Sequence, residues 1–300
     1  MKYILKIHAL GKYPEINLKK SQYDSIKRAR EVLSNGLEME AKYEILISNY
    51  LEFEKEILEH AAQSMVRKLY DYEDFFQARM SFNRRLVNLL TAARFYVDQL
   101  YRHVKAVIPD MPTVKVDIKT LFSKEYDKKL EYRFMEALRN YVQHRGIPVH
   151  WIKYNSSSDD SGEERQLIYS MELASLKEYL QEDDDFKKNV LSEIPDKIDL
   201  IMATRVYIEG ISKVHCAARK LVEQSLKESR SIIDNAQASY QKIYRDKFVG
   251  LHAICLKKNK VEDSVPLLLD WDDVRLKLTK RNLELVNLRN RYVTGKVKSS

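Results

Sequence analysis

The sequence LEYRFMEALRNYVQHRGIPVH, residues 130–150, divides into two halves when it is placed on a helix at about 100° per residue. One half is apolar and should face a core, and it holds Leu130, Phe134, Ala137, Leu138, Tyr141 and Val142. The other half is polar and carries, in order around the helix, Arg139, Gln143, Glu136, Asn140 and His144. Gly146 can adopt the left-handed conformation that closes a helix, and Pro148 cannot continue one. The helix should therefore end just after His144.

The polar residues at this helix end suit proton transfer beside a phosphate. The imidazole of His144 can take or give a proton near neutral pH. The guanidinium of Arg139 can hold a phosphate oxygen and stabilise the charge that builds on it, and the Asn140 amide can orient either group. No Cys or second His follows at metal-ligand spacing, so we expect chemistry without a metal or another cofactor.

Arg139-Asn140-Tyr141-Val142-Gln143-His144 resembles the Arg-x4-His motif of the HEPN superfamily, in the common form with Asn after the Arg. The resemblance implies a small helical bundle, and in many members a metal-independent ribonuclease whose two motifs face one cleft of a dimer. It further implies attack of the RNA 2′-hydroxyl on the adjacent phosphate, which leaves a 2′,3′-cyclic phosphate. His144 would be the acid–base residue, Arg139 would bind the phosphate, and Asn140 would position them.

Two other readings bear on the motif. Arg145 and His150 also fit Arg-x4-His, but Gly146 and Pro148 lie between them and break the helix. Alternatively, Arg139 and His144 belong to an ordinary polar helix face, with a cation near the helix C-terminus where it is stabilised.

Composition limits the protein class without fixing the function. The 300 residues allow one large or two modest domains, and 44% hydrophobic with 32% charged residues is ordinary for a globular protein. A net charge of +8 permits a nucleic-acid partner but does not require one. The two cysteines, Cys216 and Cys255, fit a reducing cytosol. Without an apolar run of membrane-spanning length or a signal peptide, we expect a cytoplasmic protein and no membrane partner.

Only 7 Gly and 6 Pro predict long helices. Before the motif we expect a short strand at 2–9, a helix at 21–33 that ends near Asn35-Gly36, and helices at 38–68 and 74–108. Residues 114–117 should form a connection, followed by the motif helix from about Ser123 to His144.

The 74–108 helix and the motif helix should be antiparallel neighbours. Counting back from their connection puts residues 82–88 beside the motif's end. The candidate RNA-binding residues are therefore Asn83, Arg84, Arg85 and Asn88, together with Gln143 of the motif helix. Asn83 falls on the apolar side of its helix and should have a partner. For each of these residues, an ordinary surface role is an equal alternative.

After the motif we expect a β-hairpin, with strands at 147–155 and 166–173 around a polar loop at 156–164. The rest of the chain should form short helices at 174–181 and 186–192, one or two long helices at 196–245, a strand pair at 248–256 and 265–269, and a helix at 271–292.

His60, within the 38–68 helix, is interpreted as a surface or packing residue. The fold class is mainly α: a HEPN-like bundle with a β-hairpin at 38–175, preceded by an extension at 1–37 and followed by a mostly helical region at 176–300.

The leading hypothesis is a metal-independent endoribonuclease of the HEPN type that acts on RNA as a homodimer. The exposed position expected for Phe95, opposite its helix's apolar face, fits such an assembly. The family implies a toxin or phage-defence role, with a possible antitoxin or defence-system partner. The alternatives are a non-catalytic HEPN-like module that binds RNA or a protein, and a helical scaffold in which the motif is incidental.

Overall fold

The computed structural model describes residues 1–69, 71–159, 165–245 and 249–293. Within these ranges the chain forms eight α-helices and two small antiparallel sheets, so the prediction of a mainly helical protein is confirmed. The chain forms two compact units, each assembled from separated stretches of sequence. Unit 1 contains residues 1–44, 99–118 and 216–283, and unit 2 contains residues 45–98, 119–215 and those from 284 onward.

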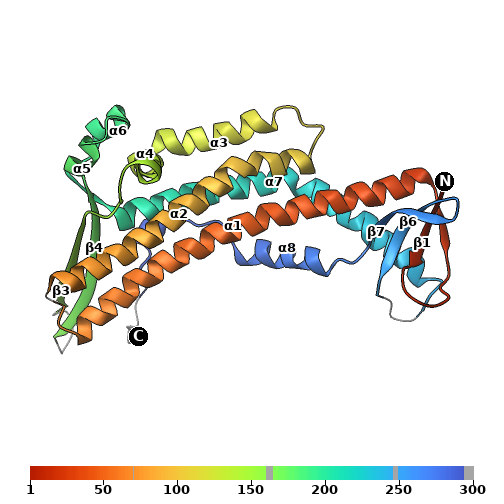
Figure 1. Ribbon diagram of the computed structural model, residues 1–300, viewed down its shortest axis with the longest axis horizontal. Helices are drawn as coiled ribbons and strands as arrows, with labels where there is room; N and C mark the ends of the chain where they lie inside the picture. Colours follow the sequence, from red (N-terminus) through yellow and green to blue (C-terminus); the bar gives the residue numbers. More distant parts are fainter. Residues whose placement is uncertain (70, 160–164, 246–248, 294–300) are drawn as a thin grey trace. The chain divides into compact units, whose positions relative to one another are not determined.

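Several of the helices are long (Figure 1), and their buried residues follow the amphipathic stripes of the sequence. None of those in the described ranges is long and apolar enough to cross a membrane. Their bounds are α1 Lys20–Val66, α2 Tyr72–Val107, α3 Val114–Lys128, α4 Leu130–His144, α5 Lys177–Gln181, α6 Lys188–Glu193, α7 Leu200–Gln241 and α8 Asp270–Arg281. A 3₁₀ turn follows at Leu288–Asn290.

Helix α1 is continuous over 47 residues, so the expected end at Asn35-Gly36 is wrong. Gly36 has a packing role instead of a terminating one. A Cβ at this position would lie 2.5 Å from Cδ2 of Leu226 and 3.1 Å from Cδ of Arg275. The missing side chain lets α7 and α8 approach α1 closely, and this contact between distant stretches outweighs the local helix-ending signal.

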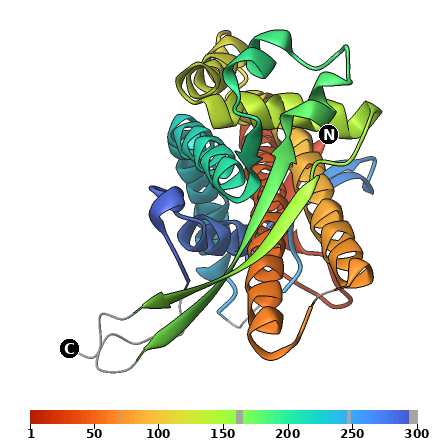
Figure 2. The same ribbon diagram turned by 90° about the vertical axis from the view of Figure 1, so that its left-hand side faces the viewer.

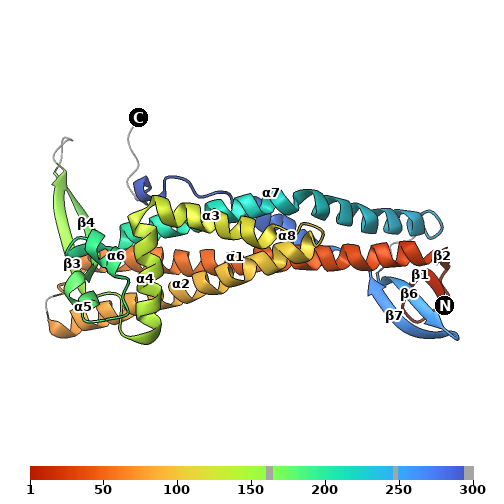
Figure 3. The same ribbon diagram turned by 90° about the horizontal axis from the view of Figure 1, so that it is seen from above.

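The motif lies on a shorter helix than predicted. Residues 114–117 form the first turn of α3 instead of a connection, and the backbone of Lys129 is extended, with φ −132° and ψ 121°. This single residue separates α3 from α4, which runs across the direction of α3 (Figure 3). The antiparallel arrangement expected from one unbroken 123–144 helix therefore does not apply.

Unit 1 contains a four-stranded antiparallel sheet in the order β2-β1-β6-β7 (Figure 1). The N-terminal strand pairs with a strand from late in the chain, so that Ile4 lies opposite Ile254. A strand pair forms in the region predicted at 248–256 and 265–269, but the bounds of its second strand are wrong, because this strand runs over 260–266. Phe248 lies outside the described residues. The bounds are β1 Lys2–Ile7, β2 Ile16–Leu18, β6 Leu251–Lys257 and β7 Lys260–Pro266.

Unit 2 contains the hairpin predicted after the motif. Strands β3 (Trp151–Asp159) and β4 (Gln166–Leu176) lie side by side with a regular antiparallel register (Figure 2). The loop expected at 156–164 is wrong for residues 156–159, which belong to β3 because they pair with β4, and residues 160–164 lie outside the described residues. A third strand, β5 (Lys197–Asp199), pairs with β4 and has no counterpart among the predicted elements. Helix α7 is a single helix of 42 residues, and α8 ends at Arg281 instead of near residue 292.

Candidate active site

Helix α4 buries one face and ends where the sequence predicts. Both Arg145 and Gly146 donate their backbone N–H groups to the Tyr141 carbonyl, at 2.8 and 3.2 Å. Gly146 does not have the positive φ that we expected of it; the glycines with positive φ in the described chain are Gly11 and Gly250. A Cβ at Gly146 would instead lie 2.5 Å from the Tyr141 hydroxyl oxygen, so its role is to leave room for that ring.

Asn140 and His144 are exposed and occupy neighbouring turns of α4, where they line a cavity of about 370 Å³. Within the described part of the chain, neither side chain makes a hydrogen bond or ion pair, so both are available to a ligand. The segment 183–187 forms the opposite wall, with Asp183, Asp185, Phe186 and Lys187.

The two cations of this cavity differ in how far they are neutralised. Arg145 forms ion pairs with Asp183 and Asp185, both at 3.0 Å. Lys187 lies over the ring of Tyr126, with its Nζ 3.1 Å from the hydroxyl oxygen, and has no carboxylate partner among the described residues. Lys187 is therefore the cation of this cavity that can contact an anion at the least electrostatic cost.

Arg139 lies on a different side of α4, in the interior. Its side chain is 9% exposed, and its Nη2 lies 3.4 Å from Oε2 of Glu136. The other Glu136 oxygen accepts a hydrogen bond of 2.5 Å from the Tyr207 hydroxyl of α7. Burial and the nearby Glu136 carboxylate raise the pKa of Tyr207, so the phenol keeps its proton and remains a donor. The predicted exposed position of Arg139 is thus wrong: it belongs to a buried polar cluster.

The motif therefore divides within one chain. Asn140 and His144 come together at the cavity, whereas Arg139 faces Glu136. Residues five positions apart are separated by about 140° around a helix, so this division follows from helical geometry.

The residues predicted to bind RNA are dispersed. Asn83 is buried, and its amide accepts a hydrogen bond from the Val149 N–H at 2.8 Å and donates to the Val149 carbonyl at 3.3 Å. Its expected partner is thus found, but no amide group remains for a ligand. Arg85 is paired with Glu56 and Glu52. Asn88 and Gln143 are exposed, and neither belongs to the cavity at His144.

Arg84 lies elsewhere in unit 2, in a cavity of about 530 Å³ that His60 also lines. The Nδ1 atom of His60 lies 3.1 Å from the Tyr154 hydroxyl oxygen, and its Nε2 lies 3.7 Å from Oε1 of Glu56. Burial lowers the pKa of His60, against the opposing effect of the Glu56 charge. This cluster was not predicted from the sequence, where its one signal is the spacing of Glu56 and His60, which puts both residues on one face of α1.

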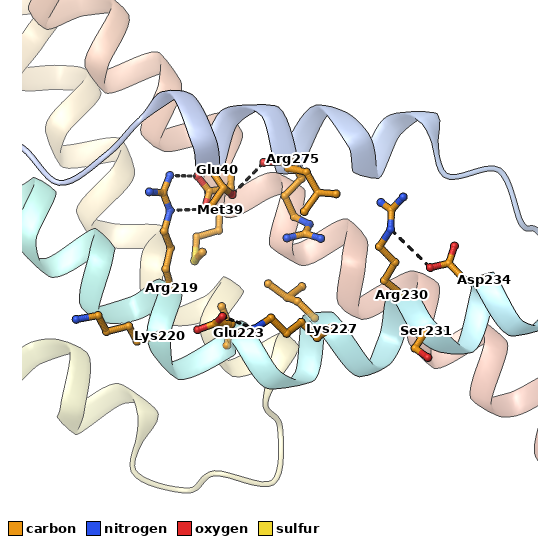
Figure 4. Close-up of a pocket in the computed structure, with 14 residues that line it drawn as sticks. Met39, Glu40, Arg219, Lys220, Glu223, Lys227, Arg230, Ser231, Asp234 and Arg275 are labelled. Atoms are coloured by element: carbon orange, nitrogen blue, oxygen red, sulfur yellow. Dashed lines mark hydrogen bonds and ion pairs between the residues drawn. The ribbon is translucent and has the colours of Figure 1, made fainter.

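Unit 1 has a cavity of about 500 Å³ between α1, α7 and α8 (Figure 4). Arg219 reaches from α7 to Glu40 of α1 with two hydrogen bonds of 2.8 and 2.5 Å, and Arg275 binds Asp272 with two of 2.6 and 3.0 Å. The floor is apolar, with Met39, Val222 and Leu226. Because carboxylates hold these guanidiniums, the cavity offers an anion little net charge.

Among the described residues, no group of three or more His, Cys, Asp or Glu side chains is arranged to hold a metal ion. Comparisons of the chain with protein-family models, with curated proteins and with solved structures each gave no match. We therefore infer the function from the arrangement of the side chains alone.

Proposed function

We propose that the protein is a metal-independent endoribonuclease of the HEPN type, and that His144 is its acid–base residue. One observation carries the proposal: His144 and Asn140 are exposed and line one cavity with Lys187, and none of the three has a charged partner among the described residues. An imidazole can transfer protons, and an amide and an ammonium group can stabilise the charge that develops on a phosphodiester.

In the proposed reaction the RNA 2′-oxygen forms a bond to the adjacent phosphorus while the bond from phosphorus to the 5′-oxygen breaks. The 2′-hydroxyl loses a proton and the departing 5′-oxygen gains one. His144 transfers these protons, Lys187 stabilises the charge on the phosphate oxygens, and Asn140 orients the phosphate by hydrogen bonding. The products end in a 2′,3′-cyclic phosphate and a 5′-hydroxyl.

Arg139 has a different role in this proposal from the one that the resemblance implies. Its guanidinium pairs with Glu136 of the same helix, and Glu136 accepts a hydrogen bond from Tyr207 of α7. Arg139 is therefore proposed as a positioning residue that acts through this buried cluster. This burial also favours a second candidate function, a non-catalytic HEPN-like module that binds RNA or a protein at the same cavity. In that case the chain retains RNA without cutting it.

The test is cleavage of a labelled RNA in excess chelator by the wild type and by the His144→Ala, Asn140→Ala and Lys187→Ala variants. We expect His144→Ala to abolish cleavage, and the other two to lower it by about 10²-fold, as for the loss of one charge-stabilising donor. A substrate with a 2′-deoxy sugar at the scissile position should resist cleavage. Full activity of His144→Ala, with its fold retained by circular dichroism, would reject the enzyme, and RNA binding without cleavage by the wild type would favour the second candidate.

We further propose that the active species is a homodimer, as the resemblance implies, with a toxin or defence role in the cytoplasm. Mixing Arg139→Ala and His144→Ala chains tests how the sites are built. If Arg139 and His144 act from different subunits, half of the sites in a mixed dimer keep both residues and activity returns. If both belong to one chain, the mixture stays inactive. The dimer would be ruled out if light scattering at micromolar concentration showed a monomer and this monomer had full cleavage activity.

A further inference from the structure

A continuous groove crosses one part of unit 2, away from the helix face that carries His144. It consists of two adjoining cavities, of about 530 and 180 Å³, which share Leu69 and Tyr154 as lining residues. The end of α1, the start of α2 and the strands β3 and β4 contribute its walls. We call it the hairpin groove, and its lining includes His60, Arg67, Arg84, Tyr154 and Tyr169.

The cations of the hairpin groove have no carboxylate partner among the described residues. Arg67 and Arg84 are both exposed, and neither forms an ion pair with any described carboxylate. Arg84 lies 3.5 Å from the Ser81 hydroxyl oxygen. The neighbouring Arg85 is different, because Glu56 and Glu52 both bind it. The described lining thus sets two unpaired guanidiniums against one carboxylate, Asp74. Unpaired guanidiniums are the ones that can bind a phosphate without first breaking an ion pair.

Two tyrosines occupy the same face of the β3–β4 hairpin. Tyr154 and Ser156 point to one side of β3, because side chains alternate along a strand, and Tyr169 lies directly opposite Ser156 on β4. Tyr154 and Tyr169 are therefore diagonal neighbours, with their Cα atoms roughly 7–8 Å apart, a separation across which aromatic side chains can contact each other. Both tyrosines are half-buried and line the same cavity.

One of these tyrosines is held firmly in place. The hydroxyl of Tyr154 bonds to His60, its ring contacts Phe75 edge-on at 5.7 Å, and Glu56 lies behind His60. Although burial opposes it, hydrogen bonds from Ser81 and Arg85 lower the pKa of Glu56, so the carboxylate stays charged. The His60–Glu56 pair thus orients the ring without occupying the groove.

We propose that the hairpin groove is a binding site for single-stranded RNA, separate from the cavity at His144. Arg67 and Arg84 bind backbone phosphates, and bases stack on Tyr154 and Tyr169. The identity of the strand as RNA rests on the proposed function. The combination of unpaired cations with aromatic faces is the one by which proteins bind single strands with little sequence preference.

The test is fluorescence anisotropy with a labelled oligouridylate of about 12 nucleotides, in chelator and in the His144→Ala background. Arg67→Ala and Arg84→Ala should each weaken binding by about tenfold, as for loss of one charged hydrogen bond. Each should also reduce the slope of log affinity against log salt by about 0.7. Tyr169→Leu should weaken binding by about tenfold, whereas Tyr154→Phe, which keeps the ring, should stay within about twofold.

Arg94→Ala is the matched control. Arg94 lies on α2 like Arg84 and is also exposed, but it is paired with Asp98 and lies outside the groove. We expect this variant to bind as its background does. Unchanged binding by the Arg67→Ala/Arg84→Ala double variant, or equal losses in Arg94→Ala, would overturn the inference, as would no RNA binding at all.

The outcomes separate this site from the catalytic proposal. If binding depends on Arg67 and Arg84 but the wild type never cleaves RNA, the proposed binding site is supported and the proposed ribonuclease activity is rejected. If cleavage depends on His144 but loss of both arginines leaves binding unchanged, the ribonuclease activity is supported and the binding site is rejected.

Discussion

Arg139→Ala should destabilise the protein, because the residue lies in the interior and not on a polar surface. Removing one partner of a buried ion pair typically costs about 3–5 kcal/mol. Here the contact is a single one of 3.4 Å, and Glu136 is 20% exposed and keeps its hydrogen bond from Tyr207. These features put the cost below that range, at about 2–3 kcal/mol, including the packing lost with the apolar stem of the arginine.

The assay is equilibrium urea unfolding followed by circular dichroism. His144→Ala is the comparison, since this side chain is exposed and has no partner in the described part of the chain. Its loss should change the free energy of unfolding by no more than about 0.5 kcal/mol. The double variant Arg139→Met/Glu136→Gln removes both charges and retains most of the apolar volume. We expect it to lie within about 1 kcal/mol of the wild type, well above Arg139→Ala.

One result would refute this reasoning. If Arg139→Ala unfolds at the wild-type urea concentration but loses RNA cleavage, the guanidinium leaves Glu136 to act at the phosphate. The role implied by the HEPN resemblance would then hold.

Three further results are expected. Gly210→Ala should lower the free energy of unfolding by about 1–3 kcal/mol, because the new Cβ would lie 2.8 Å from two ring carbons of the buried Tyr132. Helix propensity alone predicts the opposite, a gain of about 1 kcal/mol. An unchanged urea midpoint would contradict this expectation. Asn83→Asp should cost at least about 2 kcal/mol in the same assay, since a carboxylate at this buried position cannot donate to the Val149 carbonyl; wild-type stability would show that the bond is dispensable. Stability should fall as the pH drops below about 6.5, because burial lowers the pKa of several histidines and the unfolded chain then binds protons that the folded chain does not; equal urea midpoints at about pH 7.5 and 5.5 would be inconsistent with this. The histidines concerned are His60, His103, His150 and His252.

Local patterns predict much of the fold. Periodicity and the Pro and Gly positions predict the bounds of α2 closely. They also predict that a hairpin follows the motif and that a second strand pair exists, although β3 and β7 have other bounds than expected. The continuity of α1 does not, because it depends on Leu226 and Arg275 packing over Gly36 from a distant stretch. The break at Lys129 has no Gly or Pro to signal it, and the three-residue β5 exists only through its pairing with β4.

The candidate site is predictable only in part for a related reason. A helical projection separates apolar from polar positions, but it cannot tell which polar side chains a second packing surface will cover. On α4 the projection correctly exposes Asn140 and His144. It fails for Arg139, because α7 supplies Tyr207 beside Glu136. The sequence predicts a surface or packing role for His60, and it does not predict the contact with Tyr154, because the two residues are 94 positions apart in the chain.

The pairing of β1 with β6 constrains the order of events during synthesis. Ile7 lies opposite Leu251, and the intervening chain of roughly 240 residues takes about 12–50 s to emerge at 5–20 residues per second. Throughout that delay, β1 has an unsatisfied edge beside the apolar side chains of Ile4, Leu5 and Ile7, which the finished sheet buries. The nascent chain therefore carries an aggregation-prone strand until it is nearly complete, and chaperone depletion should lower the yield of soluble protein more than it lowers synthesis.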